Sequence, residues 1–299
     1  MDSVVDFEMD NKTPGKDITT EDLETKFPLA AKKHDNHKTV VKIDDIEIGG
    51  NELIIFAGPN TVENREMILE TAEQVKKRGA HFLRAGAYKP LTFPYRSDSY
   101  FELREKGLEY LKEAKEKFGI KVITEIMHVD KIDEVSKVTD ILQVGTRNMQ
   151  NYPLLEELGK QKKPVMLKRH YGASLRDWLG AAEYILYNGN PNVILCERGV
   201  SVTHTHRSTS RFLLDLQVVP AAMDFTHLPI ITDPSHATFW ASWVPPMCLA
   251  SVASGADGVM IEVHPDPKNA ATDPLQPIGF EEFSDIMNKM KKIHSIIKG

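Results

Sequence analysis

Apolar residues in this chain form short runs that alternate with longer stretches in which apolar side chains recur at helical spacing, and the alternation repeats eight times. A short apolar run bounded by turn residues predicts a buried strand, and recurrence near every third or fourth position predicts an amphipathic helix. The predicted strands span 53–57, 81–85, 121–125, 140–144, 164–168, 192–196, 229–232 and 258–263. The predicted helices span 63–78, 101–118, 129–137, 151–160, 174–187, 208–216, 243–254 and 279–297.

Eight strand-then-helix units in roughly 250 residues are typical of one α/β architecture, the (β/α)8 or TIM barrel. The run Val193-Ile194-Leu195-Cys196 is apolar throughout, as expected for a parallel strand that is covered on both faces. A doubly wound open sheet is the alternative. Its Gly-x-Gly-x-x-Gly signature is missing after the first strand, where Ala57-Gly58-Pro59-Asn60 stands. The pattern therefore predicts a barrel.

The N-terminal region lacks the alternating apolar pattern of the rest of the chain. Residues 1–38 are polar, mixed in charge and without sustained periodicity, so we expect a tail that is disordered or loosely docked. Residues 39–48 alternate apolar and polar side chains and end at a Gly-Gly-Asn turn, which predicts a short β-hairpin over 39–51. The hairpin is expected to plug the barrel or to contact another subunit. The barrel domain then runs from 39 to 299.

Composition narrows the function classes. Lys and Arg number 37 against 43 Asp and Glu, a net charge of −6, which argues against a protein that binds nucleic acid with its whole surface. No apolar run reaches the ~20 residues of a membrane span, and the N-terminus lacks the regions of a signal peptide. Cys196 and Cys248 lie in apolar runs and are expected to be buried, reduced thiols. These features predict a cytoplasmic protein.

Candidate chemistry lies at the C-terminal ends of the predicted strands and just after them, where a barrel builds its active site. Five basic residues occupy these positions: Arg84, Lys89, Arg147, Lys168 and Arg198. Such a cluster repels itself unless an anion is present, and a phosphorylated carboxylate matches it in charge and in hydrogen-bonding geometry. The alternative is that each cation pairs with a neighbouring acid such as Glu125 or Glu197. The set of five favours an anion site.

A second group combines an imidazole with carboxylates on neighbouring segments. His236, Glu262 and Asp273 together suit a divalent metal of the Mn, Fe or Zn kind. The competing interpretation is that a single His after a strand serves the structure. For three further candidates a solvated or core-satisfied imidazole is favoured: His264, His204 and His206.

At this point the motifs resemble those of a known family, from about residue 39 to the C-terminus. They are Ala57-Gly58-Pro59, Arg84-Ala85-Gly86-Ala87-Tyr88-Lys89-Pro90, residues 143–151 (QVGTRNMQN), Leu167-Lys168-Arg169, residues 194–199 (ILCERG), Asp233-Pro234-Ser235-His236-Ala237 and residues 260–267 (MIEVHPDP). The sequence resembles the 3-deoxy-D-arabino-heptulosonate 7-phosphate (DAHP) synthases. It is most similar to the shorter subgroup that shares its barrel with 3-deoxy-D-manno-octulosonate 8-phosphate (KDO8P) synthase.

The resemblance implies a transferase of the shikimate pathway to aromatic amino acids. It condenses phosphoenolpyruvate (PEP) with an aldose phosphate, by default erythrose 4-phosphate, and is a homodimer or homotetramer. By motif position the five cations hold the phosphate and carboxylate of PEP. The resemblance implies that Lys89, Asn60 and His236 are the catalytic residues, and that Lys89 protonates the alkoxide that forms when PEP attacks the aldehyde. The resemblance also places three of the family's four metal ligands at His236, Glu262 and Asp273.

Three departures concern the metal and the acceptor. The family's metal-binding Cys is Asn60 here, as in the metal-independent KDO8P synthases, so either no metal or a weakly bound one is expected. The Lys-Pro-Arg-Thr segment that grips the aldose phosphate reads 89–92 as Lys-Pro-Leu-Thr, which leaves Pro90, Thr92 and, four residues on from Thr92, Arg96 as acceptor contacts. The usual Gly-Arg-Arg is replaced by an aromatic stretch over 239–243.

These departures leave three alternatives to the default reaction. The enzyme uses a different aldehyde acceptor; it runs the retro-aldol direction on a 3-deoxy-2-keto acid; or the barrel is non-catalytic and retains PEP binding as a sensor. A barrel that had lost its catalytic function would be expected to have lost some of the five cations as well. Because all five are present, an enzyme is favoured over a non-catalytic binding module.

Overall fold

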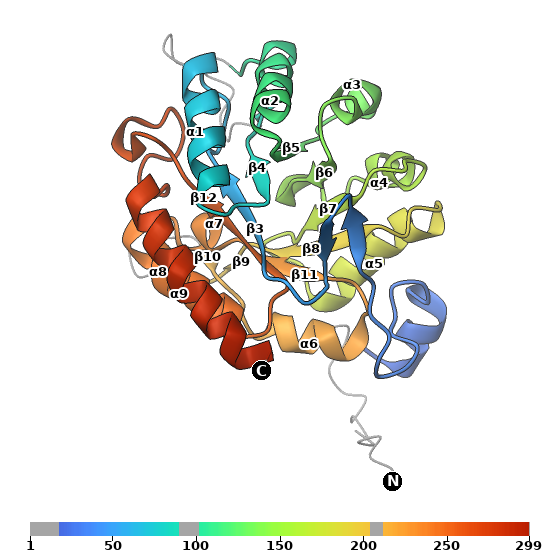
Figure 1. Ribbon diagram of the computed structural model, residues 1–299. Coiled ribbons are helices and arrows are strands. Elements are labelled where there is room, and N and C mark those ends of the chain that lie inside the picture. Colours follow the sequence, from blue (N-terminus) through green and yellow to red (C-terminus); the bar gives the residue numbers. More distant parts are fainter. Residues whose placement is uncertain (1–17, 90–101, 204–211, 299) are drawn as a thin grey trace.

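The computed structural model describes residues 18–89, 102–203 and 212–298, and within them eight parallel strands close into a barrel in the order β11-β12-β3-β4-β5-β6-β7-β8 (Figure 1). The strands are β3 Ile54–Gly58, β4 Phe82–Arg84, β5 Lys121–Glu125, β6 Ile141–Val144, β7 Val165–Lys168, β8 Val193–Glu197, β11 Ile230–Thr232 and β12 Gly258–Glu262. The predicted TIM barrel is confirmed, and the open-sheet alternative is wrong.

Helices follow the strands and form the outer ring (Figure 1). They are α1 Arg65–Lys77, α2 Glu105–Phe118, α3 Ile132–Ser136, α4 Tyr152–Gly159, α5 Leu175–Tyr187, α6 Val218–Phe225, α7 Pro234–Thr238, α8 Val244–Ala253 and α9 Phe280–Lys298. Local sequence sets their ends. At α5, for example, the Ser174 side chain accepts from the Asp177 amide while the Asp177 side chain accepts from the Ser174 amide, a complete capping box.

One predicted helix, 208–216, is wrong. Phe212–Leu213 forms strand β10, which pairs antiparallel with β9, Val200–Ser201. The helix after β8 is α6, which begins only at Val218, and residues 204–211 lie outside the described part. A short apolar run fits a strand as well as a helix turn, and here pairing with β9 decides in favour of a strand.

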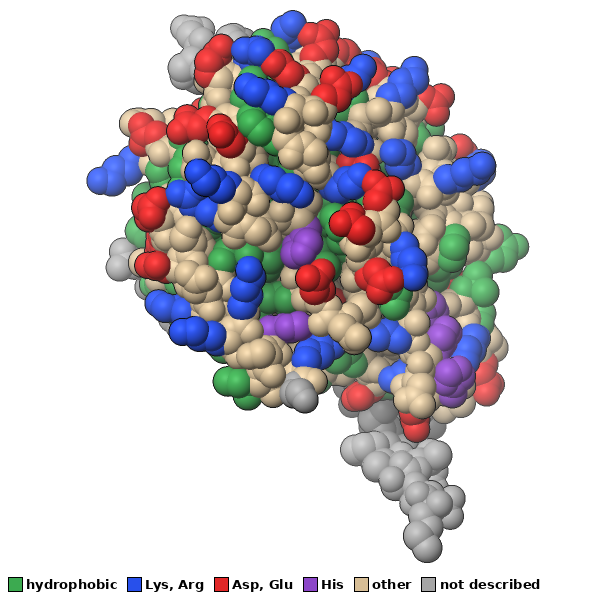
Figure 2. Space-filling model, in the orientation of Figure 1, with side chains coloured by type: hydrophobic (Ala, Val, Ile, Leu, Met, Phe, Trp, Pro, Cys, Tyr) green, Lys and Arg blue, Asp and Glu red, His purple; other side chains and the backbone are tan. Residues whose placement is uncertain are grey.

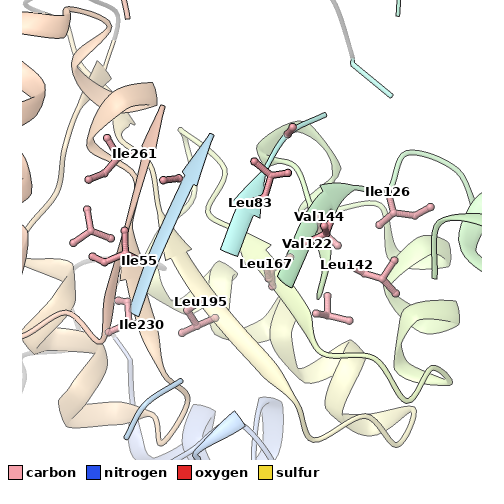
Figure 3. Packing of buried hydrophobic residues seen from close by; sticks show 14 of the residues in the cluster. Ile55, Leu83, Val122, Ile126, Leu142, Val144, Leu167, Leu195, Ile230 and Ile261 are labelled. Atoms are coloured by element: carbon pink, nitrogen blue, oxygen red, sulfur yellow. The ribbon is translucent and has the colours of Figure 1, made fainter. Parts of the chain in front are cut away.

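Strand residues alternate between the barrel interior and the helices, and each set forms its own apolar cluster. The outward set packs under the helices: Ile55, Leu83, Val122, Leu142, Leu167, Leu195 and Ile261 (Figure 3). The inward set includes Phe56 and Phe82, whose rings stack with centroids 4.7 Å apart. Apolar residues on both faces explain why the strands read as continuous apolar runs.

The predicted hairpin is confirmed as strands β1, Val41–Ile43, and β2, Ile46–Ile48. Its apolar side chains belong to the same buried cluster as the inward residues of the barrel strands, and Val41 and Ile48 are fully buried. The hairpin therefore closes the N-terminal end of the barrel, which is the plug of the two alternatives considered.

Residues 18–38 differ from the expected loose tail. Phe27 and Ala30 are buried in the main apolar cluster. The Glu183 carboxylate on α5 accepts hydrogen bonds from the amides of Leu29 and Ala30 at 2.8–3.1 Å. The π-helical turn Asp22–Lys26 is tied to α5 by Arg176, which donates to Asp22 at 2.8 Å. These partners lie more than 150 residues away in sequence, so the local polarity of the segment gave no sign of them. Residues 1–17 lie outside the described part.

The surface agrees with the composition. Acidic and basic side chains are interspersed on the face shown in Figure 2, and neither sign dominates it. None of the helices described is both long and apolar enough to cross a membrane. Cys196 and Cys248 are free and buried, as predicted.

Candidate active site

The strand alternation that fills the barrel with apolar side chains brings polar groups to its C-terminal end. Phe82 is followed two residues later by Arg84, Ile123 by Glu125, and Met166 by Lys168, each pair facing inward. At this end lies a cavity of about 490 Å³, here called the mouth. All five predicted cations line it: Arg84, Lys89, Arg147, Lys168 and Arg198. His236 and Glu125 line it as well.

One of the five cations has a buried carboxylate partner. The Lys168 ammonium pairs with Asp233, and both side chains are almost fully buried. Asp233 also binds the ring of His236, with Oδ2 2.9 Å from Nδ1. Burial opposes ionisation of Asp233, but His236, Lys168 and Arg84 together hold its pKa well below the usual value. Asp233 is therefore a fixed anion between a cation and an imidazole, a role that sequence reasoning did not assign to it.

His236 is held as a neutral ring. Burial lowers its pKa well below the usual value, and the neighbouring Lys168 and Arg84 add to the effect against the opposing Asp233. Because Asp233 is ionised, Nδ1 carries the proton and donates to it. Nε2 then carries no proton, so its 3.2 Å contact with the side-chain oxygen of Asn60 is a contact between two acceptors and not a hydrogen bond. A carboxylate that fixes an imidazole tautomer in this way is a common device in active sites.

The two acids that the sequence suggested as partners have other partners among the described residues. Glu197 pairs with Arg169 at 3.0 Å, and the same guanidinium binds Asp215 at 2.8 Å. Glu125 accepts a hydrogen bond from Gln143 at 3.3 Å. The pairing alternative thus holds for Lys168, through Asp233, but not through the two acids that the sequence suggested.

Asn60 sits at the centre of the predicted metal group. Its Oδ1 accepts hydrogen bonds from Lys89 Nζ at 2.7 Å and from Arg84 at 3.2 Å. Its Nδ2 donates to Asp273 at 2.9 Å and to Thr272 at 3.2 Å. The two cationic donors fix which end of the amide is oxygen, because an NH2 group cannot accept from them.

This arrangement does not fit a resident divalent metal. The Asn60 oxygen already accepts from two cations, and a neutral amide is a weaker ligand for these metals than a thiolate. Among the described residues no three His, Cys, Asp or Glu side chains are grouped as a metal site requires. His236, Glu262 and Asp273 are thus in one region but are not assembled as ligands.

Two titrating groups near Asn60 have strongly shifted pKa values. Burial lowers the pKa of Lys89 to about 8, and Arg84 contributes to the decrease. Burial raises the pKa of Glu262 to about 7, where it accepts a hydrogen bond from Gln276. An ammonium that can release its proton near neutral pH is suited to general acid chemistry.

The remaining predicted residues divide into two groups. His264 is buried, faces Glu63 at 3.1 Å through Nε2 and accepts the Asp266 amide through Nδ1, so it serves the structure as expected. The acceptor contacts and two histidines lie outside the described residues: Pro90, Thr92, Arg96, His204 and His206. Sequence reasoning missed Tyr171 and Phe212, both of which line the mouth. Tyr171 lies in the segment after β7, at the same spacing from its strand as Arg147 from β6, so the strand-end pattern contained a signal for it. Phe212 follows no predicted strand, and only the pairing of β10 with β9 brings it to the mouth.

A closed parallel barrel with a cation-lined cavity at the carboxyl ends of its strands defines an enzyme of the TIM-barrel class that binds a small anion. The family model described as "DAHP synthetase I family" matches residues 27–298. The chain belongs to this family, and the resemblance found in its motifs is confirmed.

Relatives agree with this membership. A phospho-2-dehydro-3-deoxyheptonate aldolase of Thermotoga maritima is 42% identical over 89% of this chain and 77% of its own. A crystal structure of that T. maritima enzyme, titled as a DAHP synthase, superposes with a TM-score of 0.84 at 41% identity and covers 90% of this chain and 77% of its own. A 2-dehydro-3-deoxyphosphooctonate aldolase of Syntrophobacter fumaroxidans is 27% identical over 84% of this chain and 90% of its own.

Proposed function

We propose that this enzyme condenses PEP with erythrose 4-phosphate to give DAHP and inorganic phosphate. The observation that carries the proposal is the convergence of five cations on one cavity at the C-terminal end of the barrel. PEP carries about three negative charges on a small frame, and its phosphate and carboxylate match the planar donor array of Arg. Family membership and the T. maritima relative point to the same reaction.

The proposed chemistry forms one bond between carbons and breaks one bond to phosphate. The methylene carbon of PEP attacks the aldehyde carbon, and the aldehyde oxygen takes the electron pair and becomes an alkoxide. Water adds to the former enol carbon as that carbon becomes cationic, and it releases one proton, which balances the proton that the alkoxide takes up. The resulting hemiketal phosphate then expels phosphate with the electron pair of the C–O bond, and the hemiketal hydroxyl gives its proton to the departing phosphate, which leaves the 2-keto group. Fixed cations in a confined cavity lower the energy of the charges that develop.

We assign the proton for the alkoxide to Lys89. Its ammonium lies 2.7 Å from Asn60 Oδ1, which holds it in place, and its lowered pKa of about 8 makes it a competent acid. Asn60 and His236 complete this side as neutral groups. Lys89 also contributes to PEP binding, together with the other members of the cation set: Arg84, Arg147, Lys168 and Arg198. We place the acceptor beyond Lys89, toward Pro90, Thr92 and Arg96.

We propose that catalysis requires no divalent metal. The Asn60 oxygen accepts hydrogen bonds from Lys89 and Arg84, so two protein cations interact with the oxygen that would otherwise be offered to a metal ion. Turnover that is unchanged after exhaustive chelation supports this, and loss of turnover that Mn²⁺ or Zn²⁺ restores contradicts it.

We also propose that the enzyme works in the cytoplasm as a homodimer or homotetramer. Light scattering on the purified enzyme tests the oligomeric state.

The second candidate is the same condensation with a different aldehyde. Leu91 stands where the family has an arginine for the acceptor phosphate, so an acceptor with less charge is the specific alternative. The test is phosphate release from PEP with a panel of C4 and C5 aldose phosphates and their unphosphorylated counterparts. Highest kcat/KM with erythrose 4-phosphate supports the default. Release with none of the aldehydes, while PEP still binds, favours the non-catalytic sensor, and cleavage of DAHP favours the retro-aldol direction.

A further inference from the structure

Arg198, which directly follows β8, is held by an aromatic ring rather than by a carboxylate. Its guanidinium carbon lies 4.2 Å from the centroid of the Phe212 ring, well within cation–π range. Its Nη1 is buried and has no hydrogen-bond partner in the part of the chain that the structure describes. Buried donors in folded proteins normally have a hydrogen-bond acceptor. Because Arg198 lines the mouth, a bound ligand is placed to supply that acceptor.

The Phe212 ring is placed by the small β9–β10 sheet. Phe212 pairs with Ser201 on β9, and the Ser201 amide donates to the carbonyl of Tyr171 at 2.7 Å, which ties the sheet to the segment after β7. The rings of Tyr171 and Phe212 lie 5.6 Å apart, and both line the mouth. The sheet, the ring pair and the guanidinium therefore form one connected wall.

Gly199 allows the close approach. It has a φ of +98°, which favours glycine, and a Cβ at this position would lie 2.9 Å from the Cβ of Phe212. A side chain here would push β10 away from Arg198. The backbone is thus shaped to bring Phe212 onto the guanidinium.

We propose that Phe212 is a positioning residue for Arg198 and so determines the affinity for PEP. The ring covers one face of the guanidinium, fixes its plane and keeps water from that face. The edge of the guanidinium, which carries the hydrogen-bond donors, stays directed at the anion. Planar pre-organisation of this kind favours two-point recognition of a phosphate or carboxylate. The inference rests on the proposed function, because it takes PEP as the anion.

The experiment measures PEP binding and steady-state kinetics in three variants of Phe212. Phe212→Leu and Phe212→Met keep an apolar side chain but remove the ring face, and we expect the Kd and KM for PEP to rise about tenfold while kcat changes less than about threefold. Phe212→Trp restores the ring and is expected to bind PEP as tightly as the parent. Leu213→Ala, on the same strand and 52% exposed, is the matched control and should change neither constant.

Equal PEP affinity in Phe212→Leu, Phe212→Met, Phe212→Trp and the parent overturns the inference. So does a loss that Phe212→Trp shares, since that shows a general packing role. These results differ from failure of the proposed function, in which the unmodified enzyme itself does not bind PEP. Thermal unfolding of each variant identifies any that is not folded, and the Met and Trp variants then decide between the outcomes.

Discussion

The two ends of the barrel interior are built from the same strands but differ in chemistry. Toward the N-terminal end the inward residues are apolar, including Phe82, Ile123 and Met166, and the hairpin covers them. Two residues further along each strand, toward the C-terminal end, stand Arg84, Glu125 and Lys168. One layer of the barrel separates a close-packed core from a charged cavity.

The apolar N-terminal end of the barrel explains how the fold remains stable with buried charges at its C-terminal end. Several charged side chains at the mouth are buried, a placement that is costly unless they are paired or bind a ligand. The apolar layer supplies stability through burial, and the pair between Lys168 and Asp233 offsets part of the cost at the mouth. Arg198 Nη1, which has no hydrogen-bond partner among the described residues, is a donor available to a bound anion. Substitutions at the two ends should therefore have separable effects on activity and on stability.

The largest effect is expected from Lys168, the last residue of β7. Lys168→Met removes a cation of the mouth and leaves Asp233 without its partner, so we expect kcat/KM to fall by about 10²–10³-fold. The matched control is Lys163→Met at the other end of the same strand, where the ammonium donates to the Thr139 carbonyl. Lys163→Met should keep kcat/KM within about twofold. Equal losses in both variants would break the comparison of the two ends.

A substitution in the apolar layer should lower stability and leave PEP binding unchanged, in contrast to a substitution at the mouth. Phe56→Ala removes a fully buried ring that stacks on Phe82, and we expect the free energy of unfolding to fall by about 3–5 kcal/mol. The PEP affinity of the folded variant should stay within about twofold of the parent. Chemical denaturation measures the loss of stability, and PEP titration of the same preparation measures the affinity. A large loss of PEP affinity in the folded protein would show that the layers are not independent.

The next effect concerns Asn60. Asn60→Cys introduces a soft, anionic ligand beside His236, and we expect the affinity for Zn²⁺ or Mn²⁺ to rise at least about tenfold. Turnover of this variant should become sensitive to chelators, whereas the parent is expected to be insensitive. Thr61→Cys, one residue along, is the matched control. Metal titration and activity after chelation measure the change, and equal metal affinity in all three proteins would contradict it.

The smallest effect is a pH dependence at the N-terminal end. The ring of His37 stacks on that of His227, with centroids 4.0 Å apart, where residues 18–38 dock. Burial lowers the pKa of His37, and the neighbouring rings of His227 and His34 add to the decrease. Burial also lowers the pKa of His227, against the opposing effect of its hydrogen bond with the Leu29 carbonyl. The rings are thus neutral when docked, so docking is fully stable above about pH 6.5 and is weakened as pH falls through the lowered pKa values.

Limited proteolysis between residues 18 and 38 should therefore be faster at pH 5 than at pH 7.5. His227→Gln, which retains polar atoms but does not titrate, should reduce the pH difference. Identical cleavage rates at both pH values in the parent would contradict the role of the stacked rings.

The sequence predicted the parts of the structure that depend on local pattern. Short apolar runs located the eight strands, and position at or just after a strand end identified Arg84, Lys168 and the other cations of the mouth. It could not predict contacts between distant segments. The docking of residues 18–38 depends on Glu183 and Arg176, and the position of Phe212 over Arg198 depends on the β9–β10 sheet. Asp233 was visible after a strand, but its double pairing requires the closed barrel.

The central claim is that the cations of the mouth bind PEP, and Arg147 gives its most direct test. Arg147 is exposed in the loop after β6, so its removal should not unfold the barrel. Isothermal titration of PEP alone into the parent enzyme should show saturable binding, and Arg147→Ala should show little or none under the same conditions. Equal PEP affinity in the two proteins would contradict the claim.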